Sequence, residues 1–199
     1  MGIAGTIVFI AAWGLALCAG QHGGEHPAIT VRLENWAEAS PVQLSEAQRA
    51  AGKIFRDAGI EINWLPVLSR SASAEPRTGA TLLMRISQSQ DFGYAEPSIG
   101  FRWERGPNDF LAIVFLDRVE KLARKWNVHS ETAAVLGCAM AHELAHLLMG
   151  SEHSSDGIMK AEWNSRAVRL AAHLELKFTA SQAAAMRDQL NRRVRAGNK

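Results

Sequence analysis

Cysteine is nearly absent from this chain, which has only Cys18 and Cys138 among its 199 residues. Cys18 falls in an N-terminal apolar stretch that we expect to be removed from the mature protein. Cys138 then has no partner, which excludes an intramolecular disulfide. Stability must therefore come from a hydrophobic core, which a chain of this length can bury. We interpret Cys138 as a core residue, because free cysteines are usually buried.

A strong excess of charge of one sign is also lacking. The chain has 22 Lys and Arg against 20 Asp and Glu, a formal net charge of +2, which argues against a dedicated nucleic-acid binder. No internal repeat and no glycine-rich phosphate loop is present. The 47% hydrophobic and 21% charged residues are typical of one globular domain. A basic cluster near the C-terminus is interpreted as a solvated helix face, with docking on an anionic surface as the alternative: Arg187, Arg192, Arg193 and Arg195.

One apolar stretch stands at the N-terminus, from Ile3 to Leu17. It is shorter than a membrane span requires, and small residues follow it at Cys18-Ala19-Gly20. We interpret residues 1–20 as a secretory signal peptide and residues 21–199 as the mature domain. The protein is then secreted or periplasmic, with no membrane span after cleavage. The segment has no Lys or Arg before its apolar part, so a lipoprotein acylated at Cys18 and an uncleaved anchor stay open as alternatives.

The segment His142-Glu143-Leu144-Ala145-His146 fits the pattern H-E-x-x-H. On a helix, positions i and i+4 share one face, so both imidazoles can reach a single metal ion. The adjacent Glu143 can act as general base for a water that the metal activates. Histidine ligands with a glutamate base favour zinc. The pattern thus predicts a zinc hydrolase site with His142 and His146 as ligands and Glu143 as catalytic residue.

The residues around this motif are compatible with a helix. The preceding run from Thr132 to Ala141 is apolar, as expected for a buried element. Ser130 is a candidate N-cap, with Glu131 in the first turn where it favours the helix dipole. Gly150 suits the position that ends a helix. We therefore expect the motif on a buried helix that ends just before Gly150.

A catalytic zinc usually has three protein ligands, which leaves one position open for water. His153 follows the expected turn at Gly150. This region resembles the metzincin clan of zinc metallopeptidases, whose pattern is H-E-x-x-H-x-x-G-x-x-H. The chain reads H-E-L-A-H-L-L-M-G-S-E-H, one residue longer before the glycine. The resemblance implies His153 as third ligand. Because of the extra residue, three alternatives stay open, the last by analogy with the gluzincins: Glu152, Asp156 and Glu175.

The resemblance also implies a role for Met159. In metzincins a methionine lies in a tight turn beneath the metal ligands, and Gly157-Ile158-Met159 is similar to that turn, in particular to the matrixin branch. Such a methionine packs under the site without binding the ion, which is close to the simpler interpretation of Met159 as a core residue. Some metzincins have a tyrosine shortly afterwards. The one tyrosine here is Tyr94, so transition-state help from such a tyrosine is not expected.

Hydrophobic periodicity predicts a mixture of strands and helices. Strands are expected at 28–35, 60–67 and 80–86, and a hairpin at 99–103 and 110–116; a loop is expected at 69–79. Helices are expected at 41–58, 117–126, the motif helix, 165–176 and 181–195. The fold class is α+β. Its element order is similar to a zincin or metzincin catalytic domain, with a twisted mixed sheet, an active-site helix, a methionine turn and C-terminal helices.

The sequence therefore predicts a secreted metalloendopeptidase that uses Zn²⁺ and Glu143 to hydrolyse peptide bonds. In metzincins an extended substrate pairs with an edge strand, a general mode of peptide recognition. The candidate edge is Phe110–Leu116 or its hairpin partner. Two other functions stay open: a zinc hydrolase of a non-protein or cell-wall amide, and a non-catalytic zinc-binding domain. The intact Glu143 counts against the latter, since a pure metal site does not need it.

Overall fold

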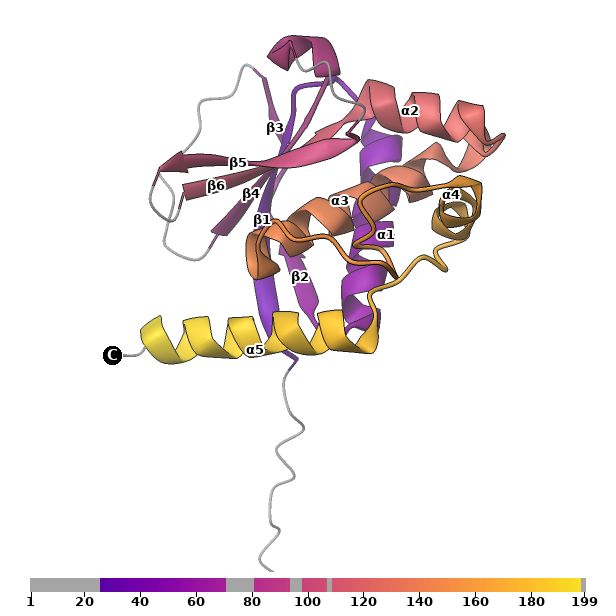
Figure 1. Ribbon diagram of the computed structural model, residues 1–199. Coiled ribbons are helices and arrows are strands. Elements are labelled where there is room, and N and C mark those ends of the chain that lie inside the picture. The colour runs from indigo at the N-terminus through magenta and orange to yellow at the C-terminus, as the bar shows by residue number, and fades with distance from the viewer. Residues whose placement is uncertain (1–25, 71–80, 94–97, 107–108, 198–199) are drawn as a thin grey trace, which may run out of the picture.

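The computed structural model describes residues 26–70, 81–93, 98–106 and 109–197. The expected signal peptide at 1–20 and most of the expected loop at 69–79 lie outside these ranges. At the centre is a mixed sheet whose main path runs in the order β2-β1-β4-β6-β5, with β3 also paired to β1 (Figure 1). All its pairings are parallel except that of β5 with β6. The expected mixed sheet is therefore confirmed.

The strands follow the sequence pattern with two differences. They are β1 (Ala28–Asn35), β2 (Glu61–Trp64), β3 (Leu68–Ser69), β4 (Thr81–Ser87), β5 (Gly100–Gly106) and β6 (Asp109–Phe115). The single strand expected at 60–67 is split into β2 and β3 around Pro66, which has no N–H to give to a ladder. The expected hairpin forms as β5 and β6, but β6 is an interior strand and β5 is an edge strand. Phe110–Leu116 as the edge was therefore wrong, and its hairpin partner lies at an edge of the sheet.

Helices cover the sheet and its lower end in Figure 1. They are α1 (Pro41–Asp57), α2 (Leu116–Lys125), α3 (Thr132–Met149), α4 (Ser165–Ala172) and α5 (Ala180–Gly197). Two short 3-10 helices, η1 (Ser89–Phe92) and η2 (His129–Glu131), were not predicted. The start of α1 follows from its sequence: Pro41 occupies the first turn, and the Ser40 hydroxyl accepts a hydrogen bond from the Gln43 N–H.

The start of α3 differs from the prediction. The N-cap is Glu131, without a side-chain cap hydrogen bond. The Ser130 hydroxyl instead donates to the Glu131 carboxylate, because the 3-10 turn η2 precedes α3 and moves its first residue beyond the reach of Ser130. The cap predicted at Ser130 was therefore wrong.

Helix α3 is long and apolar enough to span a membrane, yet most of the segment His129–Met149 is buried within the fold. It is the central helix of this domain.

The main core lies between one face of the sheet and helices α1 and α3, which cross each other (Figure 1). The crossing requires Gly137. A Cβ there would overlap that of Ala50 and lie 2.6 Å from the Ala47 carbonyl oxygen. Cys138 is buried beside it in this core, as predicted, and burial raises the pKa of its thiol to about 12. The close approach of the two helices fixes α3 beneath the sheet.

A second, smaller cluster lies on the opposite face of the sheet. It is centred on Phe115 of β6, against which Phe92 and Phe101 pack their rings. The alternation of side chains explains the division, because successive residues of a strand point to opposite faces. On β6, Ala112 and Val114 belong to the main core, while Ile113 and Phe115 belong to the smaller cluster. On β5, Gly100 consequently faces α3.

Candidate metal centre

Helix α3 places His142 and His146 one turn apart on a single face. Both side chains are buried, within a stretch of the helix that is apolar apart from these two residues and Glu143. Each Nδ1 lies 2.8 Å from a backbone carbonyl oxygen, that of Ile158 for His142 and that of Gly150 for His146. A carbonyl oxygen only accepts, so each Nδ1 carries the hydrogen. The Nε2 atoms are therefore the ones left to bind a metal.

The two Nε2 atoms lie 2.9 Å apart. Burial lowers the pKa of both imidazoles, that of His142 to about 3, so both are neutral at physiological pH. With the hydrogens on Nδ1, the Nε2 lone pairs of His142 and His146 converge without a proton between them. Two converging lone pairs repel, and a cation placed between them removes that repulsion. The geometry is thus that of a ligand pair.

His153 joins this pair from the loop after α3. The helix ends at Met149, and Gly150 adopts a φ of 99°, in the region that favours glycine. The chain then turns back, so that the ring of His153 lies 4.8 Å from that of His146 and 5.4 Å from that of His142, measured between centroids. The candidate ligand atoms of the three residues all lie within 4.8 Å of one another. The loop therefore accommodates the additional residue before Gly150.

The alternative third ligands do not join this group. Within the part of the chain that the structure describes, the group of His, Cys, Asp or Glu side chains close enough to hold one metal is His142, His146 and His153. Glu152, Asp156 and Glu175 are exposed. Two further histidines, His129 and His173, are exposed residues at helix ends.

Glu143 lies beside the ligands in an apolar environment. The side chain is almost fully buried, and Oε2 has no hydrogen-bond partner among the residues that the structure describes. Burial raises the pKa of this carboxyl to about 8. Its carboxyl group lies against Gly100 of β5, where a Cβ would come within 2.7 Å of Oε1. A buried carboxyl oxygen without a hydrogen-bond partner is costly, and a carboxyl group of strongly raised pKa that directly follows a candidate ligand in the chain indicates a functional role.

The segment predicted as a methionine turn is part of a loop closed by a backbone hydrogen bond. The Ser154 N–H donates to the Met159 carbonyl oxygen at 2.9 Å, and Met159 itself is buried. Gly157 has a φ of 70° and passes so close to the Lys177 carbonyl oxygen that a Cβ would lie 2.9 Å from it. The Ile158 carbonyl oxygen accepts from both His142 and the Trp163 indole. The turn thereby orients one of the candidate ligands.

Gln182 holds this loop from helix α5 and was not identified from the sequence. Its amide nitrogen donates to the Ser154 hydroxyl at 2.7 Å and to the Asp156 carbonyl oxygen at 3.1 Å. Its amide oxygen accepts from the Thr179 N–H, and the Thr179 hydroxyl accepts from the Gln182 N–H. This reciprocal pair is a capping box. The T-x-x-Q spacing was the available signal for the start of α5, though not for the contact with the loop.

The donor set fits a zinc ion. Three imidazoles whose ligand atoms converge are the protein ligands of one class of catalytic zinc site, which leaves the fourth position open. Two of the three have their rings fixed by hydrogen bonds to carbonyl oxygens, the usual arrangement for metal-binding histidines. Glu143 does not belong to the ligand group. Glu143, which directly follows His142 in the chain, would therefore be left free for a role other than binding the ion.

Comparisons with known proteins support the fold. No family model matches the chain, and no curated protein matches it. Among solved structures, an archaemetzincin from Methanopyrus kandleri is similar, with a TM-score of 0.52 and 12% sequence identity. The match covers 85% of this chain and 98% of that one. At this identity the likeness shows a shared fold, which extends well beyond the H-E-x-x-H segment.

Proposed function

We propose that this protein is a zinc-dependent peptidase of metzincin-like fold, with His142, His146 and His153 as ligands and Glu143 as general base. The observation that carries the proposal is the convergence of the three imidazoles, together with the buried carboxyl group of the residue after His142, whose Oε2 has no hydrogen-bond partner among the described residues. The fold shared with an archaemetzincin supports it. A metal site without catalysis gives no reason to bury Glu143.

The residues have separate tasks in this reaction. When bound, zinc supplies Lewis acidity that activates a water and polarises the substrate carbonyl. Glu143 accepts the proton of the attacking water and gives it to the leaving amine. Burial raises the pKa of this carboxyl, which strengthens it as a proton acceptor and so favours this exchange. The carbonyl oxygens of Ile158 and Gly150 hold the imidazoles in one tautomer.

An extended peptide is the proposed substrate, bound along β5. This strand is the edge of the sheet, and its first residue, Gly100, lies against Glu143. A peptide that adds to β5 through backbone hydrogen bonds passes directly beside the carboxylate. We further propose that the protein acts outside the cytoplasm, on the basis of the apolar segment Ile3–Leu17 and the small residues after it.

The proposal is tested by metal content together with cleavage of casein and of a peptide library. The parent protein, Glu143→Gln and His146→Ala are compared, with Glu46→Gln on the exposed face of α1 as a matched control. We expect one zinc in the parent, Glu143→Gln and Glu46→Gln, and none in His146→Ala. Cleavage is expected in the parent and in Glu46→Gln alone.

The other outcomes separate the alternatives. Cleavage that persists in Glu143→Gln contradicts the assigned base. One zinc without cleavage of any peptide, followed by release of amines from purified cell wall, identifies the cell-wall amide hydrolase instead. One zinc without either activity identifies a zinc-binding domain, and absence of bound zinc in the parent overturns the site itself.

A further inference from the structure

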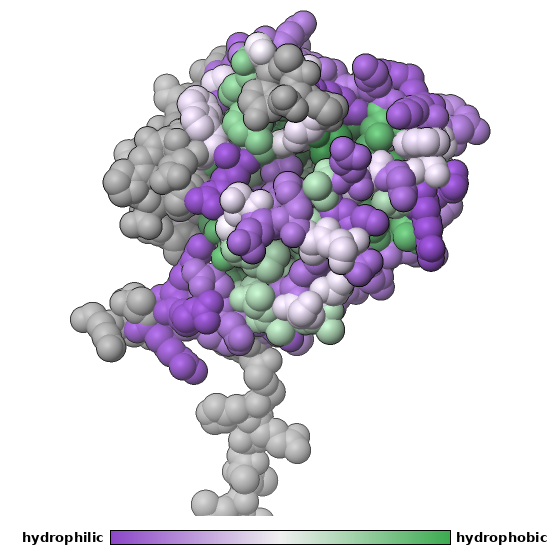
Figure 2. All heavy atoms as spheres, in the orientation of Figure 1, coloured by the Kyte–Doolittle hydropathy of each residue, from purple (hydrophilic) through white to green (hydrophobic). Residues whose placement is uncertain are grey.

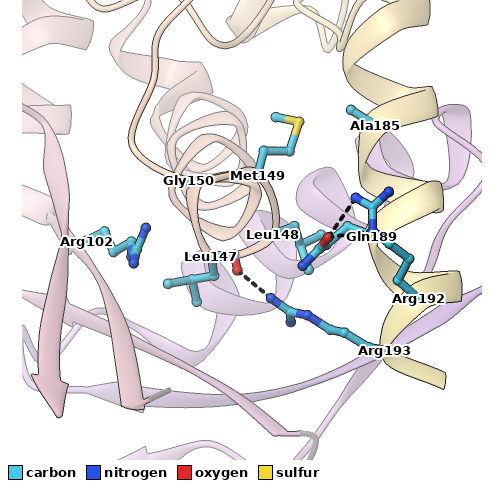
Figure 3. Close-up of a pocket in the computed structure, with 9 residues that line it drawn as sticks. All are labelled: Arg102, Leu147, Leu148, Met149, Gly150, Ala185, Gln189, Arg192 and Arg193. Carbon is cyan, nitrogen blue, oxygen red and sulfur yellow. Dashed lines mark hydrogen bonds between the residues drawn. The ribbon is translucent and has the colours of Figure 1, made fainter. Parts of the chain in front are cut away.

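A pocket of about 410 Å³ opens beside the metal centre, at the C-terminal end of α3 (Figure 3). Three elements form its walls: the end of α3, strand β5 and helix α5. Apolar side chains of α3 lie at its centre, and arginines stand on two sides, one from β5 and two from α5. The lining residues are Arg102, Leu147, Leu148, Met149, Gly150, Ala185, Gln189, Arg192 and Arg193.

The charge of this pocket is of one sign. Three guanidinium groups line it, and the described residues of its lining include no carboxylate. The C-terminal half of α5, which carries two of them, presents mainly hydrophilic side chains in Figure 2. Guanidinium groups bind carboxylates through paired, charge-assisted hydrogen bonds. The pocket is therefore complementary to a carboxylate with an apolar stem.

The two arginines of α5 that line the pocket differ in their hydrogen-bond partners. Arg193 donates to the Leu147 carbonyl oxygen at 3.0 Å and so caps the end of α3. Arg192 contacts the amide oxygen of Gln189, at 2.8 and 3.2 Å. The Gln189 amide is neutral, and no carboxylate of the described part of the chain forms an ion pair with Arg192. The contact holds the Arg192 guanidinium at the pocket, where it is available to an anion.

Arg102 connects the pocket with the metal centre. It follows Gly100 by two positions on β5, so both residues face α3, and Gly100 lies against Glu143. The positive charge of Arg102 contributes to the lowered pKa of His146, after burial and His153. Gly150, which also lines the pocket, accepts the hydrogen bond of His146. A peptide that runs along β5 past Glu143 therefore reaches this pocket within a few residues.

We infer that the pocket binds a carboxylate of the substrate, so that the proposed peptidase selects peptides with an acidic group near the scissile bond. The inference rests on the proposed function for its substrate class. The carboxylate is supplied either by an Asp or Glu side chain or by a free C-terminus. Arg102 and Arg192 determine this specificity, and Arg193 supports the pocket from the end of α3.

Binding is measured without turnover, by fluorescence anisotropy with Glu143→Gln and rhodamine-labelled octapeptides. One series carries a single Glu or Gln at each position between blocked ends. A second series lacks acidic side chains and ends in a free carboxylate or an amide. We expect the acidic member of at least one pair to bind roughly five- to twenty-fold more tightly at low salt. The preference should weaken at high salt.

The arginines are tested in the same background. Arg102→Gln combined with Arg192→Gln should remove the preference, whereas Arg49→Gln, an exposed arginine of α1, should keep it. Circular dichroism and zinc content establish that each variant is folded. Preference in the side-chain series assigns the pocket to Asp or Glu, and preference in the second series assigns it to the C-terminus.

Two outcomes overturn the inference: equal binding of acidic and neutral peptides, or a preference that survives in the double variant. The proposed function fails separately. If the parent cleaves peptides but shows no arginine-dependent preference, the peptidase stands and the pocket does not. If the preference is present but no peptide is cleaved, the pocket stands as a carboxylate site and the peptidase does not.

Discussion

The carboxyl group of Glu143 lies against the bare Cα of Gly100. A Cβ at position 100 would come within 2.7 Å of Oε1 and within 2.9 Å of Cδ, and would also overlap the Ile113 carbonyl oxygen. Strand β5 and helix α3 thus meet at a point where the Glu143 side chain fits only because position 100 has no side chain. This contact sets the distance between Glu143, the proposed base, and β5, the strand proposed to bind the peptide.

Gly100→Ala should therefore destabilise the protein by about 1–3 kcal/mol and displace the Glu143 carboxyl group. Urea unfolding of the metal-free protein measures the free-energy change. In a Glu143→Ala background the cost of Gly100→Ala should be smaller, because one of its two clashes is gone. An identical cost in both backgrounds would show that the carboxyl group does not press on β5. Zinc content should stay unchanged, since Gly100 contacts no ligand.

The crossing of α1 and α3 makes a second prediction at Gly137. A Cβ there overlaps Ala50 and lies 2.6 Å from the Ala47 carbonyl oxygen, so Gly137→Ala should cost about 1–3 kcal/mol of unfolding free energy. Gly52 on α1 is the matched control. A Cβ at Gly52 meets only the Trp64 indole nitrogen, at 4.0 Å, and Gly52→Ala should stabilise by about 0.5–1 kcal/mol. Opposite signs in urea unfolding support the crossing; a neutral Gly137→Ala contradicts it.

The sequence predicted the elements that carry periodic patterns. The strands predicted at 28–35 and 80–86 and the helix predicted at 41–58 match β1, β4 and α1 within a residue or two of the observed bounds. The H-E-x-x-H spacing placed His142 and His146 together because both lie on one helix. Residues that are distant in the sequence were beyond this reasoning. The contact of Gly100 with Glu143 depends on which strand forms the edge, and a single chain's pattern does not specify strand order.

The loop of His153 shows the same limit. Because of the extra residue before Gly150, the sequence did not decide the identity of the third ligand. The conformation of a loop depends on its contacts with residues that are distant in the sequence. Here Gln182 of α5 holds it, together with the backbone hydrogen bond between Ser154 and Met159. The basic residues of α5 were interpreted as a solvated face, yet Arg187 and Arg193 donate to carbonyl oxygens of other helices, Ala58 and Leu147. Their partners could not be read from the sequence.

Gln182 offers a third prediction. Gln182→Glu keeps an oxygen that can accept from the Thr179 N–H but removes the N–H groups that hold Ser154 and Asp156. The loop of His153 should loosen, and zinc affinity should fall about tenfold or more, as for other residues that orient ligands. Competition with a chromophoric chelator measures the affinity. Gln43→Glu on α1 is the control and should bind zinc as the parent does. Parent-like affinity in Gln182→Glu would show that the loop holds its shape without these contacts.

The pH dependence of the metal-free protein follows from two buried groups with opposite effects. Burial raises the pKa of Glu143 from 4.5 to about 8, so the folded state holds a proton that the unfolded state releases. Stability from this group is complete below pH 4.5 and is lost as pH rises through 8. Burial lowers the pKa of His142 from 6.5 to about 3. Stability from that group is complete above pH 6.5 and is lost as pH falls through 3.

Above pH 6.5, only Glu143 of these two residues still differs in protonation between the folded and unfolded states, so its effect can be measured separately. Between pH 6.5 and 8 the parent should lose about 2 kcal/mol of unfolding free energy. Glu143→Gln cannot ionise, so its stability should stay level over the same interval. The free energy of unfolding of both proteins should fall on acidification below pH 4.5, because His142 binds a proton in the unfolded state but not in the folded state. Urea unfolding in the presence of a chelator, at pH 3.5, 4.5, 6.5 and 8, covers both regions. A parallel decline of both proteins above pH 6.5 would mean that Glu143 is already ionised in the folded state, and would remove the basis for its proposed exchange of protons near neutral pH.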